Sequence, residues 1–204
     1  MKNASKIQLS PLETELVNNS DWILTKNAII QKVKLLLEDL ADQQQELLLP
    51  FKEKLPEEIL APASKISKGE NYQGLPYLVL DHPRFFSRQD IFTIRNLFWW
   101  GNFFSTTLHL SGKYKTIYEQ RVINSFDRLV DGKFFICIND DPWEHHFDGD
   151  NYTGIDSLNA GAFADVVRKH AFIKISRKIA LNEWPQAVQS LRENFRLFIH
   201  ILAD

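Results

Sequence analysis

Cysteine is almost absent from this chain of 204 residues, and Cys137 is its single representative. A lone thiol excludes an intrachain disulfide and argues against a secreted protein stapled by cystines. The opening residues, MKNASKIQLSPLE, lack the apolar core of a signal peptide. No window approaches the roughly 18 apolar residues of a membrane span. These absences predict a cytoplasmic protein without a membrane segment.

An excess of positive charge is also missing. The net charge is −2 and the isoelectric point is near 6.3. Nucleic-acid binding calls for a basic stripe or patch, so no nucleic-acid partner is expected. The motifs GxxxxGK[ST], GxSxG and HExxH are absent, and these are signatures of a phosphate-binding loop, a serine hydrolase and a zinc protease. We therefore expect no cofactor.

The first third of the chain has helical patterning. Ser10, Pro11 and Glu13 form a capping box with proline in the first turn, which predicts a short helix to about Asn19. A longer helix is expected from Asp21 or Thr25, because its apolar residues recur every three to four positions. Three prolines then mark residues 50–64 as a connector, and the lysine-containing stretch KISKGENYQG after it is expected to be a solvated loop.

The middle of the chain has a different pattern, rich in β-branched and aromatic residues. PYLVLDHP is a short β-rich run, and Gly101-Asn102 divides residues 91–110 into two strands of a hairpin. A helix over the same residues is the alternative, since Ile91, Ile94 and Phe98 also fit a helical face. Helical spacing returns after Gly112 and stops at Gly132. KFFICIN, apolar on both faces, is typical of a central strand that buries Cys137.

The last segment is expected to form a strand in AFIKISRKI and a closing helix from Asn182 to Pro185 onward. The order of these elements predicts an α+β fold, with amino-terminal helices and a carboxy-terminal helix packed on a mainly antiparallel sheet. We expect one domain over residues 1–204, with a helical part and connector over 1–64 and the sheet over 65–204.

The aromatic hairpin is the first candidate site. Aromatic side chains surround its turn, and hydroxyls and an imidazole alternate along its second strand. A ligand pocket is typically apolar with a few polar groups, but the same residues could simply cap a core. Successive strand residues point to opposite faces, so at least one of the two tryptophans should be buried. The candidate ligand-binding residues are Trp99, Trp100, Phe103, Ser105, Thr107 and His109.

The second candidate is the acidic segment INDDPWEHHFDGDNYTG, residues 138–154. From Phe134 to Val167 the chain has seven acids and no Lys or Arg, while the remainder carries 24 basic and 19 acidic residues. Carboxylates beside imidazole suit a divalent cation, and His145, Asp148 and Asp150 are the candidate ligands. Adjacent His145 and His146 should point to opposite faces, however, and the spacing fails the calcium-loop pattern. We therefore expect a mostly exposed loop without a metal.

Two stretches carry a family resemblance. The tail HAFIKISRKIALNEWPQAVQSLRENFRLFIHIL and the segment PASKISKGENYQGLPY resemble parts of an uncharacterised bacterial conserved-domain family, over about a quarter of the chain. That family has no assigned activity, so the resemblance implies an α+β fold and transfers no site residue.

The sequence thus predicts a ligand- or protein-binding module that uses the aromatic hairpin. The alternative is a metal-dependent enzyme, similar to a hydrolase, that uses the acidic segment 140–150. A structural subunit of a homodimer is a third hypothesis. The expected partner is a small molecule or a protein, and a second copy of the chain is possible.

Overall fold

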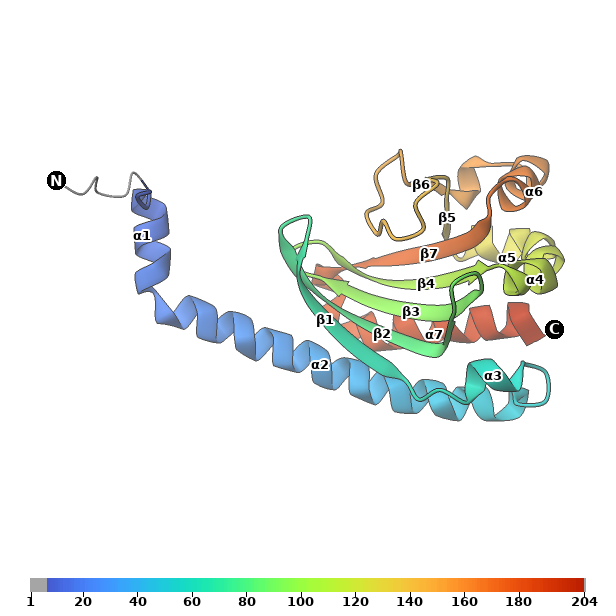
Figure 1. Cartoon of the computed structure of the whole chain (residues 1–204), viewed down its shortest axis with the longest axis horizontal. Helices are drawn as coiled ribbons and strands as arrows, with labels where there is room; N and C mark the ends of the chain where they lie inside the picture. Colours follow the sequence, from blue (N-terminus) through green and yellow to red (C-terminus); the bar gives the residue numbers. More distant parts are fainter. Residues whose placement is uncertain (1–6, 204) are drawn as a thin grey trace.

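The computed structural model of the chain describes residues 7–203. Its helices and strands follow in the order α1 (Pro11–Asn18), α2 (Ser20–Leu48), α3 (Glu57–Leu60), β1 (Lys65–Tyr72), β2 (Leu75–Phe86), β3 (Ile91–Trp99), β4 (Phe103–Ser111), α4 (Lys113–Asn124), α5 (Phe126–Asp131), β5 (Phe135–Cys137), β6 (Tyr152–Gly154), α6 (Ala160–Lys169), β7 (Phe172–Ala180) and α7 (Trp184–Ala203) (Figure 1). The predicted α+β class is confirmed.

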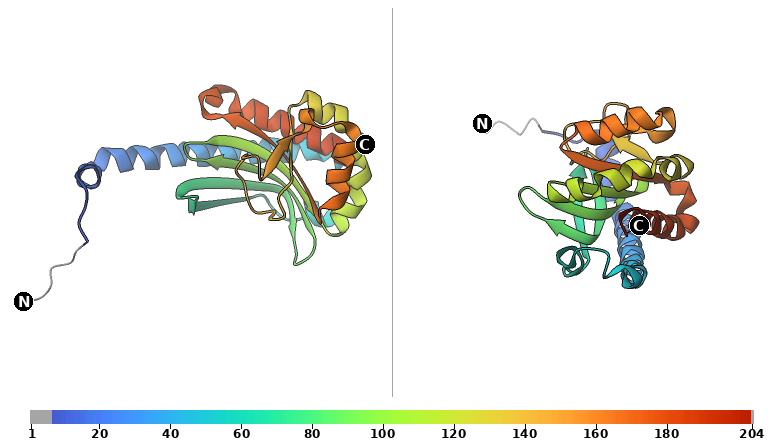
Figure 2. Two further views of the ribbon diagram at one scale, coloured as in Figure 1. Left: turned by 90° about the horizontal axis from the view of Figure 1, so that it is seen from above. Right: turned by 90° about the vertical axis from the view of Figure 1, so that its right-hand side faces the viewer.

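The sheet has seven strands in the order β1-β2-β3-β4-β7-β5-β6, and every neighbouring pair is antiparallel. Strands β1 to β4 form a meander. The last strand, β7, pairs with β4 on one side and β5 on the other, so the chain returns to the middle of the sheet before α7. Helices α2 and α7 pack together and against this sheet, as the two further views show (Figure 2).

The two amino-terminal helices form where the capping residues predict. Ser10 Oγ accepts a hydrogen bond from the Glu13 amide at 3.3 Å, and the Glu13 carboxylate accepts one from the Ser10 amide at 2.7 Å. Asn19 caps α2 through the Trp22 amide. The apolar stripe of α2 is buried from Val33 onward, against β2 and α7. The first turns of α2 bury no side chain.

The predicted hairpin is present, and its two faces differ as the alternation requires. Phe104 and Leu108 belong to the core beneath the helices, whereas Phe103 packs in a small aromatic cluster on the opposite face. Trp99 is 4% exposed in that cluster, and Trp100 packs on the helical side. The connection has three residues, not two, because Trp99 pairs with Phe103 and Gly101 adopts φ +73°.

Several expectations about local structure were wrong. Residues 65–72 form the edge strand β1 instead of a solvated loop, since their backbone pairs with β2. The helix after Gly112 divides at Ser125 into α4 and α5. Helix α6 was not predicted, although Asn159 caps it through the Ala162 amide. The strand in KFFICIN has three residues, and Cys137 at its end is buried as expected.

No helix within residues 7–203 combines the length and the apolar character that crossing a bilayer demands.

Candidate functional site

The face of the sheet opposite the helices carries two rows of polar side chains. Strand pairing places Asp81, Arg95, Thr107 and Ser176 in register across β2, β3, β4 and β7. A second row contains Thr93, His109 and Lys174. Because side chains of successive residues alternate between faces, these groups point away from the hydrophobic core. Buried polar groups need partners, so this face requires a covering that is itself polar.

Residues 138–151, between β5 and β6, supply this covering. The ring of Trp143 lies 5.6 Å from that of His109 and 5.7 Å from the guanidinium of Arg95. Phe147 stacks on Tyr152 with a centroid distance of 4.6 Å and meets Phe103 edge-on. The loop therefore covers this face largely with aromatic rings, while the carboxylates of Asp148 and Asp150 stay exposed.

The hydroxyl of Tyr72, on the edge strand β1, holds the loop against the sheet. The Tyr72 hydroxyl accepts hydrogen bonds from the amides of His145 and His146, at 2.7 and 3.0 Å, and donates one to Glu144 Oε2 at 2.9 Å. Burial and the Glu144 carboxylate raise the pKa of Tyr72 to about 12, so the hydroxyl stays protonated. The contact joins positions more than 70 residues apart in the sequence.

Lys174 fastens the same loop from the middle of the sheet. Its ammonium donates a hydrogen bond to the Glu144 carbonyl and lies 5.2 Å from the ring of Tyr152. Burial lowers the pKa of Lys174 to about 8, which still leaves it largely charged at neutral pH. A buried ammonium is retained where hydrogen bonds and aromatic faces replace its hydration.

The expectation of a mostly exposed loop was therefore wrong. Of residues 138–154, six are exposed, and these lie in the two acidic stretches on either side of the histidines. The residues between them are partly or fully covered because they pack on the polar face of the sheet.

Between the loop and strands β1 to β3 lies a cleft of about 480 Å³, which we call the sheet cleft. A volume of this size is typical of a small-molecule site. Gly69 makes room for the ring of Tyr77 at its wall, because a Cβ there would lie 2.3 Å from that ring. The lining residues are Lys65, Ser67, Tyr72, Tyr77, Val79, Asp81, Arg84, Phe86, Arg95, Trp143 and His145.

An ion pair forms one wall of the sheet cleft. Arg95 Nε and Nη2 donate to the two carboxylate oxygens of Asp81 at 2.8 and 2.9 Å, and Thr93 Oγ1 donates to Asp81 at 3.2 Å. This two-pronged geometry fixes the guanidinium plane and neutralises the carboxylate. Two of the five guanidinium N–H groups are used in this pair, so Arg95 keeps donor capacity for other acceptors.

His145 enters the sheet cleft as a neutral ring. Burial lowers the pKa of His145 to about 2, and the charges of Lys174 and Arg95 add to this effect. Its ring lies 5.3 Å from that of Tyr72. Burial likewise lowers the pKa of His109 to about 3, and in the described part of the chain its Nε2 has no hydrogen-bond partner. Both imidazoles are therefore neutral at physiological pH.

None of the candidate residues of the aromatic hairpin lines the sheet cleft, and Trp100 lies on the other, helical side of the sheet. Ser105, Thr107 and His109 are buried on the polar face, where Thr107 and Ser176 hydroxyls approach to 2.7 Å. Two of the residues that line the cleft, Asp81 and Arg95, could have been singled out from the sequence, since they are charges inside the apolar runs LVLDHP and IFTIRNLF. A charge in such a run indicates a buried ion pair or a site.

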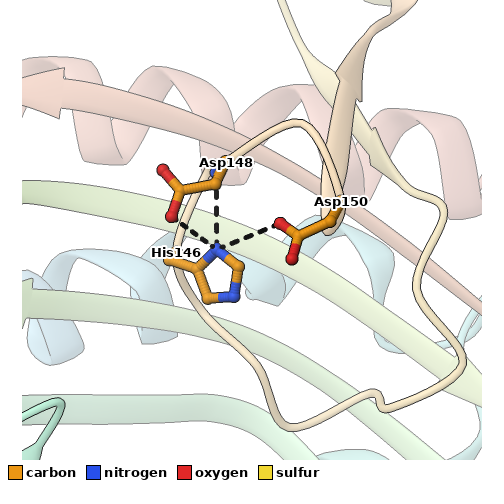
Figure 3. Close-up of side chains that lie close together, drawn as sticks. All are labelled: His146, Asp148 and Asp150. Atoms are coloured by element: carbon orange, nitrogen blue, oxygen red, sulfur yellow. Dashed lines mark hydrogen bonds and ion pairs between the residues drawn. The ribbon is translucent and has the colours of Figure 1, made fainter.

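His145 and His146 lie in different sites, as expected, but the potential metal ligands differ from those predicted. His146, not His145, lies with Asp148 and Asp150, and the three ligand atoms are within 4.8 Å of one another (Figure 3). His146 Nδ1 is 3.2 Å from Asp148 Oδ2 and 3.9 Å from Asp150 Oδ1. The Asp148 amide also points at this nitrogen, at 3.4 Å. Nitrogen with two carboxylates is a ligand set that a divalent cation accepts.

Comparison with known proteins assigns no relative. No family model, no curated protein and no solved structure matches the chain. The resemblance to an uncharacterised bacterial family stays a prediction.

The first prediction concerns the acidic trio. Asp148 and Asp150 side chains are 79% and 78% exposed, so replacing both with Asn should change the free energy of unfolding by less than about 0.5 kcal/mol. Urea denaturation of the variant and the parent measures this difference. A loss well above 1 kcal/mol would contradict a solvated position, and a zinc-dependent rise in Tm abolished by His145→Ala but not by His146→Ala would contradict the separation of the two rings.

The second prediction is a loss of stability in mild acid. The pKa values of His82, His109 and His145 are about 4, 3 and 2 in the folded chain, below the ordinary 6.5. The unfolded chain therefore binds more protons below pH 6.5, and the free energy of unfolding should fall as the pH decreases from 7.5 to 5. The limiting slope corresponds to about three protons, and His109→Gln should reduce it by about one. Urea denaturation at each pH gives the slope; a flat profile would show that these rings are not buried neutral groups.

Proposed function

We propose that the chain is a binding module for a small anionic molecule, which occupies the sheet cleft. The observation that supports this most directly is the charge of the lining. It contains three basic side chains, Lys65, Arg84 and Arg95, and one carboxylate, Asp81, which is already paired with Arg95. A lining of net charge +2 in a chain of net charge −2 favours an acidic group on the ligand.

The basic groups occupy different positions around the cleft. Arg95 belongs to the buried ion pair, with its side chain 15% exposed. Arg84 Nε donates to the Ala63 carbonyl at 2.9 Å, which orients its guanidinium. Lys65 is exposed. A carboxylate or phosphate accepts hydrogen bonds from guanidinium groups in the plane of their N–H donors, so Arg84 and Arg95 suit an oxyanion.

The remaining walls are aromatic. Tyr72, Tyr77 and Trp143 present ring faces and edges, and His145 adds a neutral donor and acceptor. Apolar walls with a few oriented polar groups are typical of sites for small organic ligands. The ligand class we propose is a compact ring-bearing molecule with one carboxylate or phosphate group.

Binding without catalysis fits these residues better than the metal-dependent enzyme predicted as the alternative. The low pKa of His145 makes its ring a weak base that stays neutral at neutral pH, so it is poorly suited to general acid–base catalysis. Asp81 is held by Arg95 and Thr93. The trio of His146, Asp148 and Asp150 is the set of potential metal ligands, but none of the three lines the sheet cleft. We also infer a reducing compartment such as the cytoplasm, supported by the single buried thiol.

The third prediction tests this proposal with matched pairs of probes. Adenosine monophosphate and indole-3-acetate should raise Tm, whereas adenosine and indole-3-acetamide, which lack the anionic group, should have little effect. Lys65→Gln should weaken binding of the anionic probe about threefold to tenfold, with a smaller loss at high salt. Calorimetric titration measures the dissociation constants.

The matched control is Lys68→Gln. Lys68 lies on the same strand with its side chain 71% exposed, and β1 alternation places it on the face opposite Lys65. The affinity of the Lys68→Gln variant for the anionic probe should equal that of the parent chain. Equal binding of the charged and uncharged probes, or equal losses in the two lysine variants, would contradict an anion site in the sheet cleft.

A further inference from the structure

Exposed apolar side chains concentrate at one end of the molecule. Among residues 7–203, thirteen large hydrophobic residues are exposed, and eight of them precede Thr25. We call residues 7–32 the arm. It comprises α1 and the first turns of α2, and Figure 1 shows it projecting from the body of the sheet and helices. The eight residues are Ile7, Leu9, Leu12, Leu16, Val17, Trp22, Ile23 and Leu24.

Packing within the chain does not account for the arm. Helix α1 has eight residues and buries none of them, and the buried residues of α2 begin at Val33. Short helices are marginal in water unless an apolar face is packed. The ion pair of Lys26 with Glu70 on β1, at 3.0 Å, attaches the arm at its base. The region beyond it presents apolar surface of the kind that marks an interaction site.

The corner between α1 and α2 is hollowed. Leu16 and Val17 from α1 and Trp22 and Ile23 from α2 line an apolar groove of about 560 Å³. Protruding apolar residues lie beside this groove, and Leu24, for example, is 61% exposed. The protruding side chains of one copy could therefore fill the groove of a second copy. Such a patch can meet its own copy across a two-fold axis.

The charges of the arm indicate which partner binds in its apolar groove. From Pro11 to Asp21 there are three acids, Glu13, Glu15 and Asp21, and no basic residue. From Trp22 to Leu37 there are three lysines, at positions 26, 32 and 34, and no acid. Two of these lysines already have partners within the chain, since Lys26 pairs with Glu70 and Lys34 with Glu38. An antiparallel approach of two identical arms still brings the acidic segment of each copy toward the lysine segment of the other, and does so twice. Charge complementarity of this kind favours one partner and one orientation.

We propose that two copies of this chain form a homodimer through their arms, which cross antiparallel about a two-fold axis near Ile23 and Leu24. The apolar groove of each copy receives apolar side chains of the other, and the acidic segment of each faces the lysine segment of the other. The sheet cleft lies outside the arm and remains open in both copies. A helix that rests on an anionic membrane would carry Lys and Arg along its polar face, whereas α1 carries two acids and no base, and the lysines of the arm all lie on α2.

The fourth prediction is a charge-swap experiment on the full chain, read by sedimentation velocity. The parent should sediment as a particle of twice the 23.8 kDa chain mass at micromolar concentration. The variant Glu15→Lys with Asp21→Lys, and the variant Lys32→Glu with Lys34→Glu, each place like charges opposite one another. Each alone should therefore raise the dimer dissociation constant at least tenfold, and an equimolar mixture should restore the dimer. Leu16→Ser with Ile23→Ser should give a monomer that no mixing with the charge variants restores.

The matched control is Asp42→Lys with Glu46→Lys, two exposed acids on the part of α2 that lies on the body. It should dimerise like the parent, and circular dichroism should show equal helix content in all variants. A monomeric parent chain would overturn the proposal. A dimer that both charge variants retain would also overturn it, as would a monomer that floats with vesicles of phosphatidylcholine and phosphatidylglycerol through its arm. None of these outcomes bears on the sheet cleft, which the lysine variants of β1 test separately.

Discussion

The hydroxyl of Tyr72 is the contact on which the arrangement of the site depends. Helices cover one face of the sheet, and the other face carries charged and hydroxyl side chains in cross-strand rows. A loop of backbone can cover such a face only if its own amides find acceptors. Tyr72 provides one for His145 and His146, and Lys174 donates to the Glu144 carbonyl. These bonds hold Trp143 and His145 at the wall of the sheet cleft.

Two consequences follow for the chemistry of the sheet cleft. The covering loop removes water from Lys174, His109 and His145, and this burial lowers the pKa of each. It also leaves the two histidines in different places, because His146 lies with Asp148 and Asp150, whereas His145 lines the sheet cleft. The molecule therefore has a basic cleft and an acidic outer loop within a few residues of each other. In our proposal, the basic cleft attracts an anionic ligand, and the acidic loop covers the polar face of the sheet.

The parts of the fold that depend on neighbours in sequence could be predicted. The capping box at Ser10 and the alternation along Phe103–Ser111 are local signals, and both helix α1 and strand β4 follow them. Strand β1 was not predicted because many of its residues are polar and its extended conformation depends on pairing with β2. The sheet cleft could not be predicted, since Tyr72 meets Glu144 across 72 positions. The sequence showed Asp81 and Arg95 as charges in apolar strands, but not that they face each other.

The hydrogen exchange of the His145 and His146 amides tests the central role of Tyr72 most directly. Tyr72→Phe removes the acceptor and keeps the ring, so these two amides should exchange about fivefold faster, the effect expected from losing a bond worth roughly 1 kcal/mol. The amides of β3 and β4 should keep their protection, and Tyr77→Phe should leave the loop unchanged. If the loop amides exchange at the parent rate in Tyr72→Phe, the hydroxyl does not hold the loop and the account is wrong.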